Sequence, residues 1–283
     1  MNPTALSEKL LFATLRLEVE APGGGRTGTG FLFSHSIERD LILPLLVTNK
    51  HVVENGTMLK TQIHRADGNG QPILSQSELI TIVNPGQTFI SHPNPDVDLC
   101  AFCVGPILTQ TRAGGTDLFS QPLSSSLLPT EQKLDDLSAV EDVVMVGYPI
   151  GLWDAANNLP LIRRGITASH PRVDFDGKQL GLIDAACFPG SSGSPVLVLN
   201  EGTHFAKRGI VIVESRIILL GVLCSVPYYE PDGRIEVRTI PTSPTSVLPV
   251  PVIQQMVHLG FYVKAKAVQE LAELIALRAT SDT

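Results

Sequence analysis

The sequence predicts a mainly β protein with two groups of strands and a helical C-terminus. Most apolar runs are short, rich in valine, isoleucine and leucine, and bounded by Gly, Pro, Asn or Asp, which is typical of strands rather than helices. Residues 106–140 contain a Gly-Gly pair, three consecutive serines and scattered prolines, which is typical of a long connection between two units. Residues 264–278 place apolar side chains at close to the helical period. We therefore expect an all-β fold with helices at its C-terminal end.

The order of these segments predicts four regions. An N-terminal β unit spans residues 8–105, a connection spans 106–140, a C-terminal β unit spans 141–250, and a helical segment spans 251–283. The helices are expected at 252–259 and 264–278. Strands are expected at 11–19, 29–34, 41–48, 57–65, 99–104, 142–147, 161–170, 179–184, 195–199, 209–213 and 217–225.

The glycines at the start of the chain are best explained by a turn. Residues 23–28 (GGGRTG) formally contain the GxGxxG pattern of dinucleotide-binding sites. No acidic residue and no helix follow in a βαβ unit, which that site requires. A hairpin turn between two strands is the better interpretation.

Composition and charge exclude several classes of function. With 43% hydrophobic and 17% charged residues, the chain has the balance of an ordinary globular protein. It carries 21 Lys and Arg against 28 Asp and Glu, a net charge of −7, so it lacks the basic surface that nucleic acids and anionic membranes attract. Its most apolar stretches are shorter than the about 20 residues that span a bilayer. We expect a soluble protein that binds neither nucleic acid nor membrane.

The cysteines favour a reducing compartment. There are four, and Cys100 and Cys103 are too close in one strand to pair conveniently. Cys100 and Cys103 also form a CxxC, but no second pair completes a zinc site, and strand residues three apart point to opposite faces. The first residues lack the basic and apolar regions of a signal peptide. We expect a cytoplasmic protein with no metal site at these cysteines.

The segment with the most chemical information is residues 184–195 (DAACFPGSSGSP), just before the strand-like 195–199. Gly190 and Gly193 permit backbone conformations in which successive N–H groups converge on one point, as stabilisation of an oxyanion demands. Ser192 lies between them and is the candidate nucleophile. A serine hydroxyl needs a base within hydrogen-bond reach, and the base needs a third group to orient it.

His51 and Asp98 are the candidates for those two roles. His51 follows the apolar strand at 41–48, and a histidine at a strand end is well placed to project into a cleft. Asp98 precedes the strand at 99–104, and Asp96 is a nearby alternative. A lone serine, histidine or aspartate in such a place is usually structural. The three together, each beside a strand, favour a catalytic triad.

The motifs around these residues resemble a known family. Residues 48–53 (TNKHVV), 98–101 (DLCA) and 190–195 (GSSGSP) occur in the order His, Asp, Ser and are similar to the three catalytic motifs of the trypsin/chymotrypsin-like serine proteases. Residues 27–32 (TGTGFL), 146–151 (VGYPIG) and 184–186 (DAA) are similar to the HtrA-like bacterial branch. Few residues follow the second strand group, so we expect a relative without a PDZ domain.

The resemblance implies two six-stranded antiparallel β-barrels, as in chymotrypsin, with the triad in the cleft between them. It makes His51 the general base and then acid, Asp98 the residue that orients it, and Ser192 the nucleophile. The N–H groups of Gly190 and Ser192 become the oxyanion hole. No cofactor is required.

Three departures from the family pattern stand out. Ser191 occupies the place where digestive relatives carry an aspartate that pairs with a freed N-terminus, so we do not expect activation by N-terminal cleavage. Lys50 precedes the histidine where small or amide residues are usual, and Ser194 replaces a common glycine. Neither change removes a catalytic group.

The resemblance also locates a substrate-binding pocket. Its base is Ala186, and its walls come from the strand at 221–226 and from residues 247–249. The side chains there are Cys187, Cys224 and Val226, with no carboxylate to pair with Lys or Arg, whose buried charge would stay unpaired. We expect cleavage after small or medium apolar residues. Two buried thiols are best interpreted as structural, with a redox-sensitive pocket as the alternative.

The leading hypothesis is a serine endopeptidase that acts on protein or peptide substrates through an acyl-enzyme. An active triad in a cytoplasm is hazardous, so we expect a gate: an oxyanion loop that must order, a narrow substrate choice, or a regulatory protein partner. The rival is a protease-like module that binds a peptide in the cleft without turnover. An α/β-hydrolase esterase is disfavoured, because the Ser, Asp, His order and the GxSxG elbow are absent.

Overall fold

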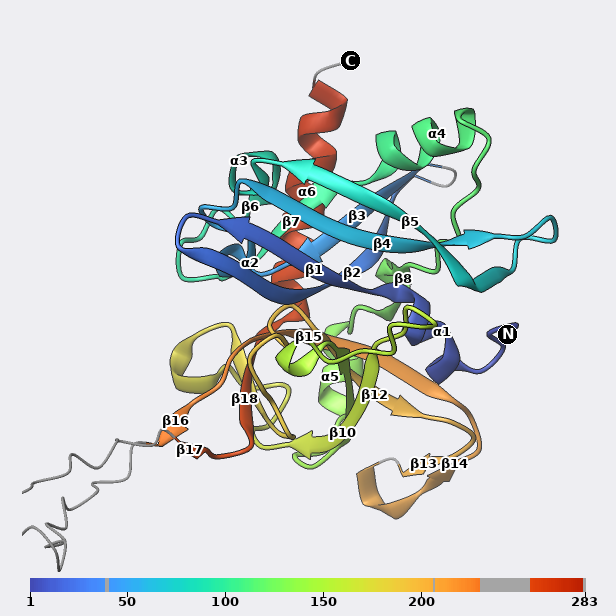
Figure 1. Ribbon diagram of the computed structural model, residues 1–283. Coiled ribbons are helices and arrows are strands. Elements are labelled where there is room, and N and C mark those ends of the chain that lie inside the picture. Colours follow the sequence, from blue (N-terminus) through green and yellow to red (C-terminus); the bar gives the residue numbers. More distant parts are fainter. Residues whose placement is uncertain (39–40, 206, 230–254, 282–283) are drawn as a thin grey trace, which may run out of the picture.

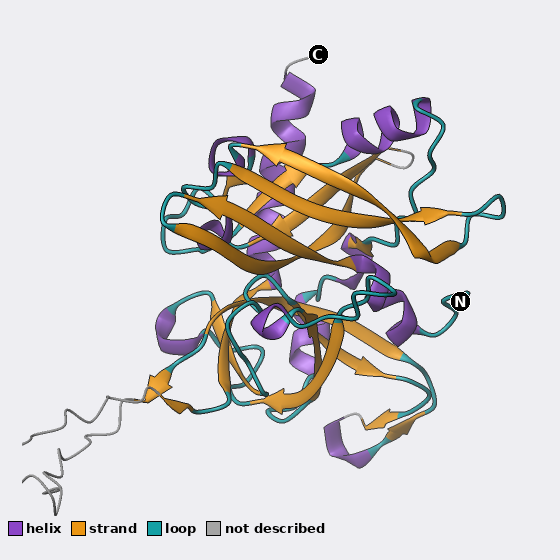
Figure 2. Cartoon of the chain, viewed as in Figure 1, coloured by secondary structure: helices purple, strands orange, loops and turns teal. Residues whose placement is uncertain are grey.

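The computed structural model confirms a mostly β fold and describes residues 1–283 apart from 39–40, 206, 230–254 and 282–283 (Figure 1). Two β units lie one above the other, and a long C-terminal helix runs behind the upper one (Figure 2). None of the described helices is long and apolar enough to cross a bilayer. No group of three or more His, Cys, Asp or Glu within the described ranges is placed to hold a metal ion.

The N-terminal unit is one eight-stranded sheet. Its strand order is β5-β4-β1-β2-β3-β7-β6, and β8 pairs with β2 in parallel. The strands are β1 (Thr14–Ala21), β2 (Gly24–Glu38), β3 (Leu41–Thr48), β4 (Met58–Ala66), β5 (Pro72–Val83), β6 (Ile90–Ser91), β7 (Cys100–Cys103) and β8 (Leu123–Ser124).

The predicted six-stranded first barrel does not close. In the part of the chain that the structure describes, β5 and β6 remain the two edges of the sheet. The strand at one edge, β6, is only two residues long, which is too short to carry a hydrogen-bonded ladder across to β5. The turn between β1 and β2 is the expected hairpin, with Ala21 opposite Gly24 and Gly23 at φ +95°.

The C-terminal unit is the predicted closed six-stranded antiparallel barrel. The order of its strands is β10-β11-β18-β15-β12-β9. Its interior holds alternate aliphatic side chains of β9, β12 and β15, together with Tyr262. The barrel strands are β9 (Asp142–Gly147), β10 (Leu161–Thr167), β11 (Leu180–Asp184), β12 (Pro195–Asn200), β15 (Arg216–Ser225) and β18 (Leu259–Lys264).

Shorter elements connect these strands. The helices are α2 (Lys50–Val53), α3 (Pro85–Thr88), α4 (Gly105–Ala113) and α5 (Glu131–Asp136), and single 3₁₀ turns lie at η1 (Ser125–Leu127), η2 (Pro149–Gly151), η3 (Phe175–Gly177) and η4 (Lys207–Gly209). Two small hairpins pair β13 (His204–Phe205) with β14 (Val211–Ile212), and β16 (Tyr228–Tyr229) with β17 (Gln255–Met256).

Three local predictions were wrong. Residues 11–13 belong to helix α1 (Leu6–Ala13), because the Glu8 carboxylate accepts the N–H groups of Thr4 and Ala5 and caps the helix start. The edge strand β5 was missed because a polar run at residues 75–78 interrupts its apolar residues, and few of its side chains are buried. The last barrel strand, β18, lies inside the segment 251–283 that was expected to be helical, because Gly260 and Tyr262 alternate into the barrel. Of the first expected C-terminal helix, 252–259, residues 252–254 lie outside the described residues, and Gln255–Met256 form strand β17 instead of a helix.

The C-terminal helix α6 (Ala265–Ser281) confirms the second expected helix and joins the two units. It contacts β15 of the barrel as well as β2, β3 and β7 of the sheet (Figure 1). Its buried face, which includes Val268, Leu271 and Ile275, belongs to a core shared with both units. The two units are therefore held in register by one continuous apolar core rather than by a linker.

We expect Leu271→Ala to lower the free energy of unfolding by about 2–5 kcal/mol, because it empties a fully buried site in the shared core. Leu271 is 1% exposed. Urea unfolding followed by circular dichroism measures the change. The exposed Lys266→Ala, on the same helix, is the control and should change stability by less than about 0.5 kcal/mol; equal effects of the two variants would contradict the shared core.

Candidate active site

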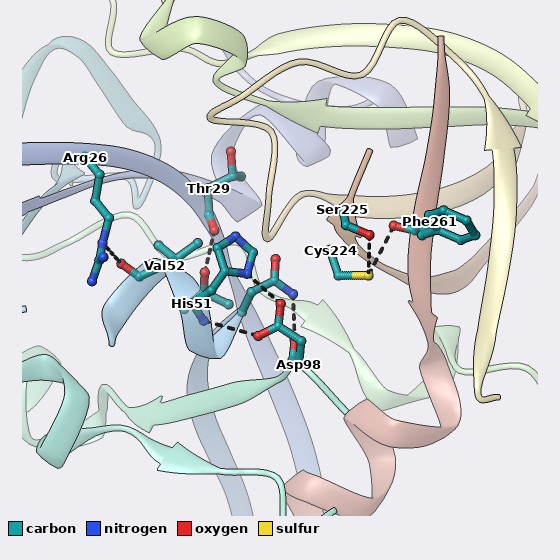
Figure 3. Close-up of polar contacts among 10 residues, drawn as sticks. Arg26, Thr29, His51, Val52, Asp98, Cys224, Ser225 and Phe261 are labelled. Carbon is teal, nitrogen blue, oxygen red and sulfur yellow. Dashed lines mark hydrogen bonds and ion pairs between the residues drawn. The ribbon is translucent and has the colours of Figure 1, made fainter. Parts of the chain in front are cut away.

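His51 is placed by the short helix α2 at the end of β3. Val52 and Val53 are buried in the core of the sheet, and the Arg26 Nε–H donates to the Val52 carbonyl at 3.0 Å (Figure 3). The sequence thus fixes the helix by its two valines and turns the neighbouring His51 side chain outward, where it is 47% exposed. The position of His51 at a strand end and its exposure are compatible with the role of a base.

Asp98 lies against this histidine. Its Oδ2 is 2.6 Å from His51 Nδ1, and its Oδ1 accepts the backbone N–H of His51 at 3.2 Å (Figure 3). Pairing of β3 with β7 sets Thr48 opposite Cys100, so the chain ends that carry the two residues meet. The carboxylate accepts the Nδ1 hydrogen and leaves Nε2 with its lone pair, which is the tautomer that a general base requires.

The alternative carboxylate, Asp96, plays a different part. Its backbone N–H donates to the Asn94 side chain at 3.0 Å, and it makes no contact with His51. A residue that the sequence did not single out, Asn49, instead supports Asp98: its Nδ2 donates to the Asp98 carbonyl at 2.7 Å. The preference for Asp98 over Asp96 agrees with this geometry.

The turn that carries Ser192 is fixed on both sides by backbone hydrogen bonds. The N–H of Gly193 donates to Leu223 at 2.8 Å, and the N–H of Leu223 donates to Ser194 at 2.9 Å. Gly190 and Gly193 both have φ +90°. At Gly193 there is no space for a side chain, because a Cβ would lie 1.8 Å from the Thr29 carbonyl oxygen. The glycines are therefore required by conformation and by close approach.

Two N–H groups of this turn have no acceptor. Ser191, Gly193 and Ser194 donate theirs within the protein, whereas the N–H groups of Gly190 and Ser192 donate to no described residue. The Gly190 carbonyl is held by the Thr29 hydroxyl, which donates to it at 2.8 Å. Two unpaired donors, the N–H of the candidate nucleophile itself and the N–H two residues before it, are what an oxyanion hole needs.

Thr29 of β2 joins the two halves of the site. Its N–H donates to the Ser192 carbonyl at 2.8 Å, and its own carbonyl accepts the Thr48 hydroxyl at 2.7 Å. Thr48 ends the strand that leads to His51, and both threonines are fully buried. The serine turn of the barrel and the histidine of the sheet are thereby tied to one residue.

Ser192 Oγ itself makes no hydrogen bond to a described residue. Its neighbour Ser191 is fully buried, and the Ser191 hydroxyl has no partner either. In enzymes without bound substrate, the hydrogen bond between a nucleophile and its base is often long and tightens only when substrate binds. The structure therefore brings His51 and Asp98 into contact, and brings Ser192 to the same junction through Thr29.

Of the residues predicted for the substrate pocket, Cys187 belongs to the core inside the barrel, and Cys224 belongs to the core shared with the sheet. Ala186 and Val226 are partly buried. Cys187 is 1% exposed, and its Sγ faces the space that a Cβ on Gly260 would fill. The Cys224 thiol is buried and donates to the Phe261 carbonyl at 3.4 Å (Figure 3). The proposed wall at 247–249 lies outside the described residues.

The four cysteines are free thiols. Burial raises the pKa of Cys187 to about 12 and that of Cys224 to about 11, and only the thiolate form of a cysteine is reactive. Cys100 and Cys103 point to opposite sides of β7, into different core clusters. These observations favour structural thiols over a redox-sensitive pocket or a metal-binding CxxC.

His51 and Asp98 border an open hollow of about 720 Å³. Its other walls come from the β1–β2 turn, α2 and the segment around α3, and most of its side chains are polar. The residues of these walls, polar and apolar together, are Pro22, Lys50, Val53, Glu54, Asn55, Gly56, Asn84, Gly86, Gln87, Ser91 and Pro95. All of the residues that line the hollow belong to the N-terminal unit, and the turn that carries Ser192 is not among them.

Comparison with known sequences identifies the family of this chain. Residues 28–205 match the family model described as a trypsin-like peptidase domain. The chain belongs to the trypsin-like peptidase family. None of the curated proteins compared with the peptidase matches it.

Solved structures similar to the peptidase include HtrA-type proteases. The HtrA-type protease AlgW with a tripeptide is 15% identical, with a TM-score of 0.51 over 94% of this chain and 60% of that one. AlgW with a decapeptide is 14% identical, with a TM-score of 0.50 over 96% and 68%. A serine endoprotease from Yersinia pestis is 14% identical, with a TM-score of 0.47 over 96% and 67%. At these identities the likeness shows the fold, and the peptidase spans about 60% of the first AlgW chain.

We expect Gly190→Ala to lower the reaction of the protein with a fluorophosphonate by at least about 100-fold, the effect of losing one oxyanion donor. A Cβ at Gly190 would lie 2.6 Å from the Tyr148 carbonyl oxygen, so the peptide that carries the donor must move. Gly177→Ala is the matched control, because Gly177 also has positive φ but has open space around it. A Gly190→Ala protein that reacts as fast as the control would contradict the assigned oxyanion hole.

Proposed function

We propose that this peptidase is a serine endopeptidase that hydrolyses peptide bonds of protein or peptide substrates through Ser192, His51 and Asp98. The observation that carries the proposal is the 2.6 Å contact between His51 Nδ1 and Asp98 Oδ2, next to a serine turn with two unpaired N–H groups. The similar AlgW structures were solved with a tripeptide and a decapeptide, which supports a peptide as a ligand of this protein.

The first half of the reaction forms an acyl-enzyme. His51 Nε2 takes the Ser192 hydroxyl proton while Oγ attacks the carbonyl carbon, and Asp98 stabilises the imidazolium that forms. The carbonyl oxygen gains the negative charge and accepts hydrogen bonds from the N–H groups of Gly190 and Ser192. When the C–N bond breaks, the imidazolium gives its proton to the leaving amine.

The second half restores the enzyme. Water enters, gives a proton to His51 Nε2 and attacks the ester carbon, and the same oxyanion donors hold the new charge. Collapse of this intermediate breaks the bond to Ser192 Oγ, which receives the proton back from His51. The products are a carboxylic acid and an amine, and no metal or cofactor takes part in these steps.

Two observations bear on the compartment of the enzyme and on the regulation of its activity. All four cysteines are free, as a reducing cytoplasm favours, and we propose that compartment. The Ser192 hydroxyl has no bond to His51, which fits a resting enzyme whose site is completed by substrate or by a regulatory protein partner. The alternative function is a peptide-binding module without turnover. A covalent probe of the serine nucleophile distinguishes it from an active peptidase.

We expect a fluorophosphonate to modify one residue, Ser192, in the wild-type protein. Ser192→Ala should abolish the labelling, and His51→Ala should slow it by at least about 1,000-fold, because the base is lost. Mass spectrometry of the digested protein identifies the modified residue. Labelling of another serine, or labelling that is equally fast without His51, would contradict the triad, whereas no labelling with or without peptide substrate would favour the binding module.

We expect cleavage after alanine or valine to be at least about 100-fold more efficient than cleavage after lysine. The pocket residues Ala186, Cys187, Cys224 and Val226 offer no carboxylate to a basic side chain, which would stay unpaired. The preference is measured with a peptide library in which the residue before the cleaved bond is varied over all amino acids. Mass spectrometry of the products gives the relative kcat/KM for each residue. A preference for lysine or arginine would contradict the pocket assignment.

A further inference from the structure

The buried histidine His92 lies outside the proposed triad and uses both of its ring nitrogens. Its side chain is 4% exposed. Nδ1 accepts the backbone N–H of Asn94 at 3.2 Å, and Nε2 lies 3.2 Å from Glu270 Oε2. Because Nδ1 is an acceptor, Nε2 carries the hydrogen and donates it to the carboxylate. The ring therefore links the C-terminal helix to the turn that follows β6.

That turn carries Asp98. A backbone hydrogen bond joins the two ends of the turn: the N–H of His92 donates to the Leu99 carbonyl at 2.9 Å. Inside it, the Asn94 carbonyl accepts the N–H of Val97 at 3.2 Å and the Lys50 ammonium at 3.0 Å. Asn94 is thus bound to His92 on one side and to Lys50, the residue before His51, on the other. Both members of the His51–Asp98 pair are connected to His92 by short hydrogen-bonded segments.

Glu270 is held in place by the packing of α6. Its neighbours Val268 and Leu271 are 1% exposed and belong to the core shared by sheet and barrel. The Glu270 side chain is 35% exposed, so one carboxylate oxygen is turned inward to His92 while Lys266 lies 4.0 Å from the other. A helix fixed by a core can position a hydrogen-bond acceptor more accurately than a surface loop can.

We propose that Glu270 and His92 are positioning residues that set Asp98 against His51, so that the C-terminal helix controls the catalytic pair. The inference rests on the proposed function, because it concerns the same site. It assigns to α6 a role beyond filling the core: displacement of this helix moves the turn at 92–99 and weakens the 2.6 Å contact between His51 and Asp98. Shifts of about 1 Å in such a group cost up to about 100-fold in rate.

The test compares Glu270→Ala, Glu270→Gln and Glu273→Ala by the rate and the final extent of fluorophosphonate labelling at Ser192. We expect Glu270→Ala to be labelled about 10-fold more slowly than wild type and to the same final extent. Glu270→Gln should stay within about twofold of wild type, because its amide oxygen still accepts from His92. Glu273, exposed on the next turn of α6, is the control and should have no effect. A purely structural role would lower the final extent, which measures the folded fraction, rather than the rate.

Glu270→Ala is also introduced into an Asp98→Ala protein, which shows whether Glu270 acts through the position of Asp98 or in another way. If Glu270 acts through Asp98, then Glu270→Ala should slow the labelling of Asp98→Ala by less than about twofold. A 10-fold loss in both backgrounds, or wild-type rates for Glu270→Ala, would overturn the inference while leaving the proposed function intact. Failure of wild-type protein to label would instead overturn the proposed function.

Discussion

The hydrogen bonds of Thr29 hold the site together. This one residue of β2 donates its N–H to Ser192, its hydroxyl to Gly190, and accepts the Thr48 hydroxyl. Ser192 belongs to the barrel and His51 to the sheet, so neither unit contains a triad by itself. Because Thr29 is fully buried, its bonds are shielded from water and their loss would leave buried polar groups unpaired. The serine turn and the histidine strand are positioned by the same short stretch of backbone.

The residues that stabilise the fold are different from the candidate catalytic residues. The apolar core shared by α6, the sheet and the barrel fixes the relative position of the two units. The catalytic candidates lie on short segments that project from it: a one-turn helix for His51, a closed turn for Asp98, and a glycine-lined turn for Ser192. Such segments cannot hold their geometry alone. They depend on bonds to buried groups, among them Asn49 and His92, whose side chains reach the Asp98 turn from β3 and β6.

The sequence predicted the β class, the C-terminal barrel, the helix after residue 264 and the His51–Asp98 contact. The β class and the helix follow from local signals such as short apolar runs and helical periodicity. The closed barrel was implied by the resemblance to the trypsin-like proteases. It did not predict β5, whose polar residues are those of an exposed edge strand, nor the open first sheet, because closure depends on how strands meet across the fold. Thr29 lies in the motif at 27–32, but the sequence does not show which groups a buried threonine binds. Glu270 and His92 are 178 residues apart, and no pattern in the chain connects them.

The claim that the two units assemble one catalytic centre is tested most directly by a crystal structure of the fluorophosphonate-treated protein. The account predicts an adduct on Ser192 Oγ whose phosphoryl oxygen lies about 2.7–3.1 Å from the nitrogens of Gly190 and Ser192. His51 Nε2 should lie beside the adduct, with its Nδ1 still bonded to Asp98. An adduct on another residue, or a phosphoryl oxygen turned to solvent with His51 far from Ser192, would contradict it.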